Sequence, residues 1–96
     1  MLRWKLSEQA AMDIVSIFAD GISRFGVSQA TKYRDDLEHI FDALASSPRI
    51  GREHLGADQI IRIHFHLAHV IAYVIEPTAI MIVRILPTRS DWKEVL

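Results

Sequence analysis

Three apolar runs rich in isoleucine and valine lie close together between residues 59 and 92. Short breaks separate them at Leu67–Ala68 and at Glu76–Thr78. β-Branched residues favour strands, and links this short join antiparallel neighbours, because a parallel crossover needs about a dozen residues or more. The pattern therefore predicts three consecutive antiparallel strands. Alternation in the first run assigns Ile61, Ile63 and Phe65 to one face and Arg62, His64 and His66 to the other. In the third run, Ile80, Ile82 and Arg84 alternate with Met81, Val83 and Ile85.

The first half of the chain shows a short alternating stretch and then two helical patterns. Residues 2–6 alternate as a strand does, and Ser7 is a candidate N-cap for the helix that follows. Gly26 is expected to end this helix, since glycine adopts the left-handed conformation without a Cβ clash. Ser28 is a candidate N-cap for a second helix, which should end near Ala45 or Ser46 ahead of Pro48. Helical spacing predicts one buried face made by Ala11, Ile14, Val15, Phe18 and Ile22, and another made by Ala30, Tyr33, Leu37, Ile40, Phe41 and Leu44.

Residues 47–58 combine glycine, proline and charged residues and are predicted to form a loop. Neither helix can bury its apolar face alone, so the helical pair must pack against the strands. The sequence thus predicts an α+β fold in the order β-α-α-β-β-β. An N-terminal strand is followed by an antiparallel two-helix hairpin on one face of a mainly antiparallel sheet of three to four strands. With 96 residues, the chain is expected to be one domain, 1–96.

Composition excludes several classes of protein. The formal net charge of −1 argues against a dedicated duplex-DNA binder, so no direct sequence-specific DNA binding is expected. The chain has no cysteine, which excludes disulfides and thiolate zinc sites. Its most apolar stretch is interrupted by Glu76, Pro77 and Arg84, and its opening lacks the apolar run of a signal peptide. A cytoplasmic protein with no membrane association is therefore expected.

An ordered set of short segments resembles the ParE toxins of the RelE/ParE superfamily, the toxic half of bacterial type II toxin–antitoxin pairs. The similar segments are Leu6–Ser7 with Ala10, Ile14 and Phe18; Arg24–Gly26 with Ala30 and Tyr33; Ser47–Pro48 with Ile50–Arg52; His69–Ile71 with Tyr73; and Arg84–Leu86 with Arg89, Asp91 and Trp92. The resemblance implies a toxin that inhibits DNA gyrase, arrests growth and serves in plasmid stabilisation. It also implies a cognate ParD-like antitoxin as partner, and allows a toxin dimer within a hetero-oligomer. RelE-like relatives instead cleave messenger RNA on the ribosome, so a ribosome-dependent endoribonuclease is the alternative function. A non-toxic binding domain that keeps the same fold is a third.

Arginines on the later strands are the main candidates for contacts with the target. A ribonuclease uses such groups to hold the scissile phosphate, together with an acid or base that reaches the reacting oxygen. This chain has Pro87 where the resembled ribonucleases often have histidine, and no tyrosine follows Tyr73. We therefore predict a binding surface with no catalytic residue, made by Arg62, Tyr73, Arg84, Arg89 and Trp92. The alternative is that the arginines pair with carboxylates such as Glu76 or Asp91.

Ile17, Phe25 and Val27 fall outside the two apolar faces and are predicted to dock the antitoxin. His64, His66 and His69 have a spacing that could suit a metal. No acidic or cysteine ligand lies near them in sequence, so a polar strand face, with neither metal nor cofactor, is favoured. The acidic residues of the second helix are predicted to be solvated or to steer a basic antitoxin segment; they are Asp35, Asp36, Glu38 and Asp42.

Overall fold

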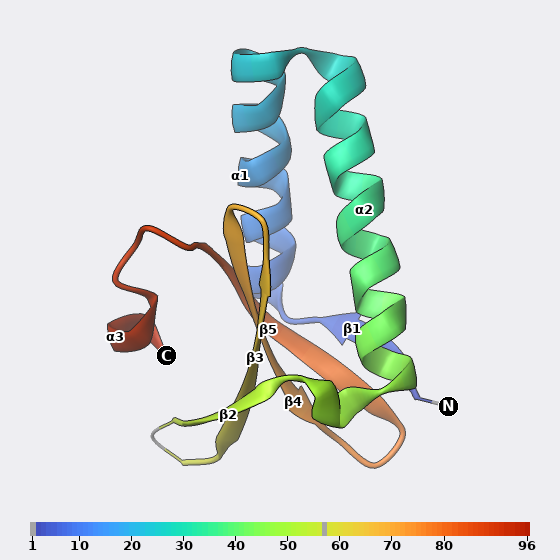
Figure 1. Cartoon of the computed structure of the whole chain (residues 1–96), viewed down its shortest axis with the longest axis vertical. Coiled ribbons are helices and arrows are strands. Elements are labelled where there is room, and N and C mark those ends of the chain that lie inside the picture. The colour runs from blue at the N-terminus through green and yellow to red at the C-terminus, as the bar shows by residue number, and fades with distance from the viewer. Residues whose placement is uncertain (1, 57) are drawn as a thin grey trace.

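The computed structural model describes residues 2–56 and 58–96. Its elements are β1 (Arg3–Leu6), α1 (Glu8–Phe25), α2 (Val27–Ser46), the short 3₁₀ helix η1 (Pro48–Ile50), β2 (Arg52–Leu55), β3 (Ile60–His66), β4 (His69–Ile75), β5 (Ala79–Pro87) and α3 (Trp92–Val95). The two long helices run side by side, and their connection lies at the end away from the sheet (Figure 1). This arrangement confirms the predicted α+β fold with a helical pair against a sheet.

The sheet has five strands in the order β1-β5-β4-β3-β2. β1 is parallel to β5, with Trp4 opposite Ile80, and all other neighbours are antiparallel. The unforeseen strand is β2, so the prediction of a loop over residues 47–58 was wrong for Arg52–Leu55; Ala57, within that range, lies outside the described residues. Three of the four β2 side chains are exposed, so β2 lacks the apolar alternation that marks a strand, and it is held by backbone pairing to β3.

Two caps set the ends of the long helices. Ser7 is the N-cap of α1 as predicted: its Oγ accepts a hydrogen bond from the Ala10 N–H at 3.0 Å and donates one to the Val83 carbonyl at 2.8 Å. Gly26 ends α1 with a φ of +90° and also precedes the first residue of α2. The assignment of Ser28 as the second N-cap was therefore wrong. The one-residue link at Gly26 leaves no room for a separate capping residue, and α2 begins at Val27.

The main core lies between the helices and the sheet. The predicted face of α2 is confirmed, with Leu37, Phe41 and Leu44 at most 1% exposed. At the edge of this core, the Trp4 ring meets Phe41 edge-on at 5.1 Å, and its Nε1 donates to the carboxylate of Asp42 at 2.8 Å.

The predicted face of α1 was wrong in part. Ala10 is fully buried, and Ile14 and Ile17 pack against the core, whereas Val15 is 68% and Ile22 36% exposed. The helix is apolar on two sides, so periodicity alone cannot say which one faces inward.

A register shift between Ala72 and Tyr73 breaks the predicted alternation of β5. Ala72 pairs with Arg84 but Tyr73 pairs with Ile82, so Val83 is an extra residue. Beyond the shift, Ile85 joins Ile80 and Ile82 in the helix-facing core instead of lying on the opposite face.

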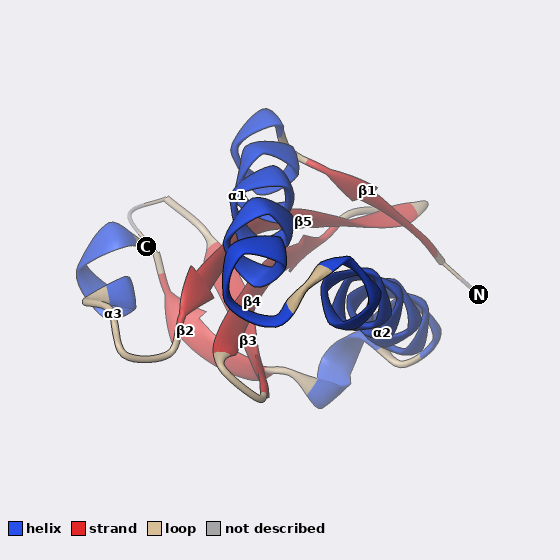
Figure 2. Ribbon diagram, turned by 90° about the horizontal axis from the view of Figure 1, so that it is seen from above, coloured by secondary structure: helices blue, strands red, loops and turns tan. Residues whose placement is uncertain are grey.

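The other face of the sheet carries a second apolar cluster, formed by Ile61, Ile63, Val70, Ala72 and Val74. The C-terminal segment covers it through Trp92 and Leu96. Figure 2 shows α3 apart from the two long helices and beside β2. The tail thus completes the burial of a sheet that is apolar on both faces.

The β3–β4 hairpin has a strained tip. Leu67 has a φ of 51°, a left-handed conformation that costs a residue with a Cβ about 1–2 kcal/mol. The Leu67 side chain adds little stability through burial, since it is 75% exposed.

Replacing Leu67 by glycine should therefore stabilise the protein. We expect Leu67→Gly to raise the free energy of unfolding by about 1 kcal/mol and the melting temperature by about 4–8 °C. The neighbouring Ala68→Gly is the matched control and should be neutral or destabilising, because Ala68 does not have a positive φ. Thermal unfolding followed by circular dichroism measures both. Equal destabilisation by the two substitutions would contradict the strain.

Candidate functional site

The side of α1 opposite the core is apolar and open to solvent. Its residues are Ala11, Met12, Val15, Ala19 and Ile22, which we call the α1 outer face. Met12 and Val15 are each 68% exposed. Positions 12, 15, 19 and 22 are separated by three or four residues, the spacing with which a helix meets a partner helix. An apolar surface of this kind marks a protein interaction site.

The tip of the helical hairpin extends this surface. Phe25 is 70% and Val27 61% exposed, at the end of the hairpin farthest from the sheet (Figure 1). Of the three residues predicted to dock an antitoxin, these two are accessible. Ile17 is half-buried and packs on the main core. Sequence reasoning missed Met12 and assigned Val15 and Ile22 to the core, because both faces of the helix fit the same periodicity.

Arg84 is held by an internal carboxylate. Its Nε and Nη2 donate to Asp13 of α1 at 2.8 and 3.1 Å, and the same carboxylate accepts the Ile85 N–H at 2.9 Å. The hydrogen bonds to Asp13 raise the pKa of Arg84 above its ordinary value. The pair joins α1 to β5 beside the register shift. Its partner is thus Asp13, 71 residues away in sequence, and neither Glu76 nor Asp91.

Arg62 and Tyr73 fasten the segment after α2 to the sheet. Arg62 donates to the Gly51 carbonyl at 2.8 Å and to the Glu53 carboxylate at 3.0 Å. The Tyr73 hydroxyl donates to the Pro48 carbonyl at 2.6 Å and accepts the Gly51 N–H at 3.0 Å. Burial raises the pKa of Tyr73, which keeps the phenol protonated as a donor.

Two features show how closely Tyr73 and this segment fit. A Cβ at Gly51 would collide with the Tyr73 ring, so only glycine allows the approach. Tyr73 itself is 0% exposed, so its role in this structure is internal.

Arg89 and Trp92 lie in the tail after β5. Arg89 is exposed, and Trp92 is half-buried against the second face of the sheet. The Trp92 ring meets Phe65 edge-on at 5.6 Å and lies 6.0 Å from the His54 ring, measured between centroids. Phe65 is 45% exposed, so this aromatic pair presents a partly open surface. Of the predicted target-binding residues, Arg89 is the one in the exposed class.

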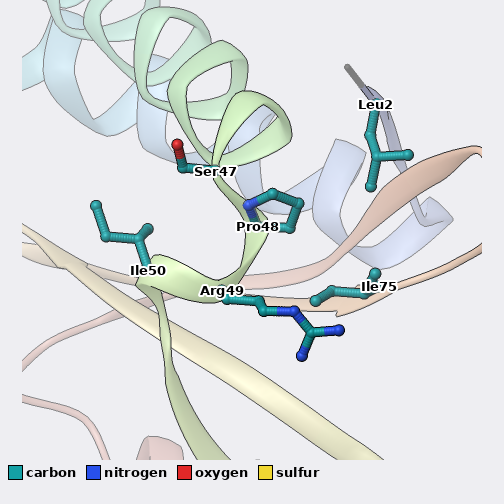
Figure 3. Close-up of a pocket in the computed structure, with 6 residues that line it drawn as sticks. All are labelled: Leu2, Ser47, Pro48, Arg49, Ile50 and Ile75. Carbon is teal, nitrogen blue, oxygen red and sulfur yellow. The ribbon is translucent and has the colours of Figure 1, made fainter.

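An open cleft of about 430 Å³ lies where the start of the chain, η1 and the end of β4 meet (Figure 3). It is lined by Leu2, Ser47, Pro48, Arg49, Ile50 and Ile75. Ile50 is 67% exposed at its edge. The cleft is mostly apolar with one guanidinium, so it suits an apolar side chain next to an acidic one.

The histidines of β3 and β4 do not form a metal centre in the part of the chain described, where no group of three or more histidine or acidic side chains could hold an ion. His69 instead contacts Tyr33 of α2. Among residues 2–56 and 58–96, no helix has the length and apolar character needed to cross a membrane.

The Arg84–Asp13 pair can be tested by stability. We expect Arg84→Ala and Asp13→Ala each to lower the free energy of unfolding by about 2 kcal/mol, with a double variant well short of the sum. Arg24→Ala, which removes an exposed pair with Asp20, is the control and should change little. Chemical denaturation measures all four. An Arg84→Ala variant with unchanged stability and lost toxicity would instead show that Arg84 acts on the target directly.

Comparison with known proteins gives a consistent result. The family described as "ParE toxin of type II toxin-antitoxin system, parDE" matches residues 4–92. "Toxin ParE1" of Mycobacterium tuberculosis, in strains CDC 1551 / Oshkosh and ATCC 25618 / H37Rv, is 34% identical over 93 residues, which span 93% of this chain and 92% of the relative. A solved structure titled "Chromosomal ParDE TA system from P. aeruginosa" has the same fold, with a TM-score of 0.77 at 19% identity over 91% of this chain and 96% of that chain. The chain therefore belongs to the ParE toxins of the parDE type II toxin–antitoxin systems.

Proposed function

We propose that this ParE toxin arrests growth by binding and inhibiting DNA gyrase, and that a ParD-like antitoxin silences it by seating an amphipathic helix on the α1 outer face. The observation that carries the proposal is the unpartnered apolar stripe on α1. A helix that is apolar on both sides is normally buried on both sides. Among the residues that the structure describes, the side with Ala10, Ile14 and Ile17 is covered, whereas Met12 and Val15 are exposed.

A helical antitoxin segment fits the α1 outer face in shape and in chemistry. Met12, Val15, Ala19 and Ile22 repeat at intervals of three, four and three residues, which is the arrangement into which the apolar side chains of a second helix interdigitate. The exposed Phe25 and Val27 at the hairpin tip lengthen the same surface. Burying such side chains stabilises a complex by about 1.5–3 kcal/mol each.

An extended antitoxin segment has a second place to bind. β2 is an edge strand, so one side of its backbone is not paired within the sheet. Leu55 of β2 is 82% exposed and lies opposite Ile60, which is 51% exposed. An added strand would pair with the free backbone and cover these side chains.

Inhibition by binding, with no chemical step, agrees with where the arginines lie. A ribonuclease needs guanidinium groups free to hold the phosphate at the moment of reaction. Arg84 is engaged by Asp13, and Arg62 by Gly51 and Glu53. Arg89 and the partly open Trp92–Phe65 pair are accessible for contact with a large partner. Aromatic and arginine side chains together are typical anchors of such contacts.

Substitution of Val15 by aspartate tests the antitoxin site. A carboxylate in the middle of the α1 outer face must be desolvated on binding, so Val15→Asp should weaken antitoxin affinity at least about thirtyfold. Cells that produce both proteins should then stop growing. Ser16→Asp is the matched control, because Ser16 is exposed on the same helix but lies outside the stripe. Neutralisation of Val15→Asp at wild-type antitoxin levels would refute this site.

Substitution of Arg89 by alanine tests the target surface. In a supercoiling assay with purified gyrase, we expect Arg89→Ala to raise the inhibitory concentration about tenfold while the melting temperature is unchanged. Arg3→Ala removes an exposed arginine of the edge strand β1 and is the control.

Two outcomes would favour the other functions. Cleaved messages at defined codon positions, after incubation with translating ribosomes, would show a ribonuclease. Normal growth of cells that make the chain without antitoxin would show a non-toxic domain.

A further inference from the structure

The methionines of the described part of the chain differ in how far solvent reaches them. Met12 of α1 is 68% exposed. Met81 of β5 is half-buried, lies opposite Val74 and packs against the second apolar cluster. Met1 lies outside the described residues. The chain has no cysteine, so no thiol competes for an oxidant. Of the two described methionines, Met12 is therefore the one that a dissolved oxidant reaches more readily.

Met12 also lies within the α1 outer face. It is three residues before Val15 and seven before Ala19, so the three side chains share one side of the helix. A methionine side chain is unbranched and polarizable, and it adapts to irregular gaps in a partner surface. In the complex proposed above, the same thioether that is open in the free toxin is covered by the antitoxin helix.

We propose that Met12 is a redox-sensitive site, at which a peroxide converts the thioether of the free toxin to a sulfoxide and thereby weakens binding of the antitoxin. The inference rests on the proposed seat of the antitoxin on the α1 outer face. It adds a chemical modification and a direction of control to that site: oxidised toxin assembles less readily with its antitoxin, whereas toxin that is already bound is shielded from the oxidant.

Hydrogen peroxide supplies both the oxygen atom and the oxidising equivalents. A lone pair of the Met12 sulfur attacks one peroxide oxygen, and an S–O bond forms as the O–O bond breaks. The other oxygen leaves and becomes water with the proton released from the transferred oxygen. The sulfur is oxidised by two electrons and the peroxide is reduced. Methionine sulfoxide reductases reverse the change, each acting on one epimer at sulfur.

The sulfoxide acts on binding and not on the fold. Its oxygen is a polar acceptor that must lose water when a helix covers it, and its neighbours on the stripe, Val15 and Ala19, offer no side-chain donor. In the free chain the oxygen remains in water. Among the described residues of α1, Ile14 and Ile17 pack on the main core and Met12 does not.

Peptide mapping by mass spectrometry tests the accessibility of the site in the intact chain. In dilute hydrogen peroxide, we expect Met12 of the free toxin to gain one oxygen at least about fivefold faster than Met81, because of its greater exposure. Saturating antitoxin should slow the reaction at Met12 and leave Met81 unaffected. Equal rates at the two methionines of the free toxin would overturn the proposal.

Antitoxin affinity tests the consequence. Toxin is treated with peroxide, the peroxide is removed with catalase, and the dissociation constant for untreated antitoxin is compared with that of the same toxin before treatment. We expect about tenfold weaker binding, restored by a mixture of both methionine sulfoxide reductases, at an unchanged melting temperature. Treatment should not alter the affinity of Met12→Leu, which has no sulfur there, but should still weaken that of Met81→Leu. Unchanged affinity of a toxin oxidised at Met12, or an equal loss in Met12→Leu, would refute the site.

The Val15→Asp variant separates this inference from the proposed function. If Val15→Asp weakens antitoxin binding and oxidation of Met12 does not, the antitoxin is seated on the α1 outer face and only the redox inference fails. If neither change weakens binding, the antitoxin is seated elsewhere and both fail.

Discussion

The structure depends on a helix that is apolar on two sides, only one of which the chain can bury. Ala10, Ile14 and Ile17 of α1 complete the core with α2 and the sheet. Met12 and Val15, on the other side, are each 68% exposed in the described part of the chain. The sheet is also apolar on both faces. Its second face is covered by the chain itself, through Trp92 and Leu96 of the tail. No residue that the structure describes covers the α1 outer face in this way, and this is why we propose that a helix of the antitoxin binds there.

The polar groups that could have served catalysis hold the fold together. Arg84 joins β5 to α1 through Asp13, and Arg62 holds the segment around Gly51 to β3. Tyr73 reaches the same segment from β4 through two short hydrogen bonds. A guanidinium that is engaged in this way must give up its partners before it can clamp a phosphate, and each lost bond costs about 1.5–3 kcal/mol. Our proposal therefore assigns recognition of the target to exposed side chains of the tail, of which Arg89 is the clearest.

Local patterns predicted the elements better than they predicted the contacts between them. Alternation and turn residues correctly identified β3, β4 and β5, and Ser7 and Gly26 correctly marked the two ends of α1. The inward face of α1 could not be predicted because both apolar faces of the helix share the same period. The strand β2 could not be predicted because it is held by backbone pairing to β3 and buries few side chains.

The sequence also could not predict which distant residues pair in the fold. Asp13 and Arg84 meet only through the fold, and the shift at Ala72 and Tyr73 moves Ile85 to the other face of β5 with no local signal. The arginines themselves were visible in the sequence. The sequence did not show that Arg62 and Arg84 are engaged internally, because the fold determines which groups they meet.

The central claim concerns what covers the α1 outer face, and a thiol-labelling measurement tests it most directly. The chain has no cysteine, so Val15→Cys introduces a single reactive site on that face. Lys32→Cys places one on the exposed surface of α2 for comparison. If the account is correct, bound antitoxin slows labelling at position 15 at least about tenfold and leaves position 32 unaffected, because a docked helix excludes the reagent from the apolar stripe. Full reactivity at position 15 in a neutralised complex would contradict it.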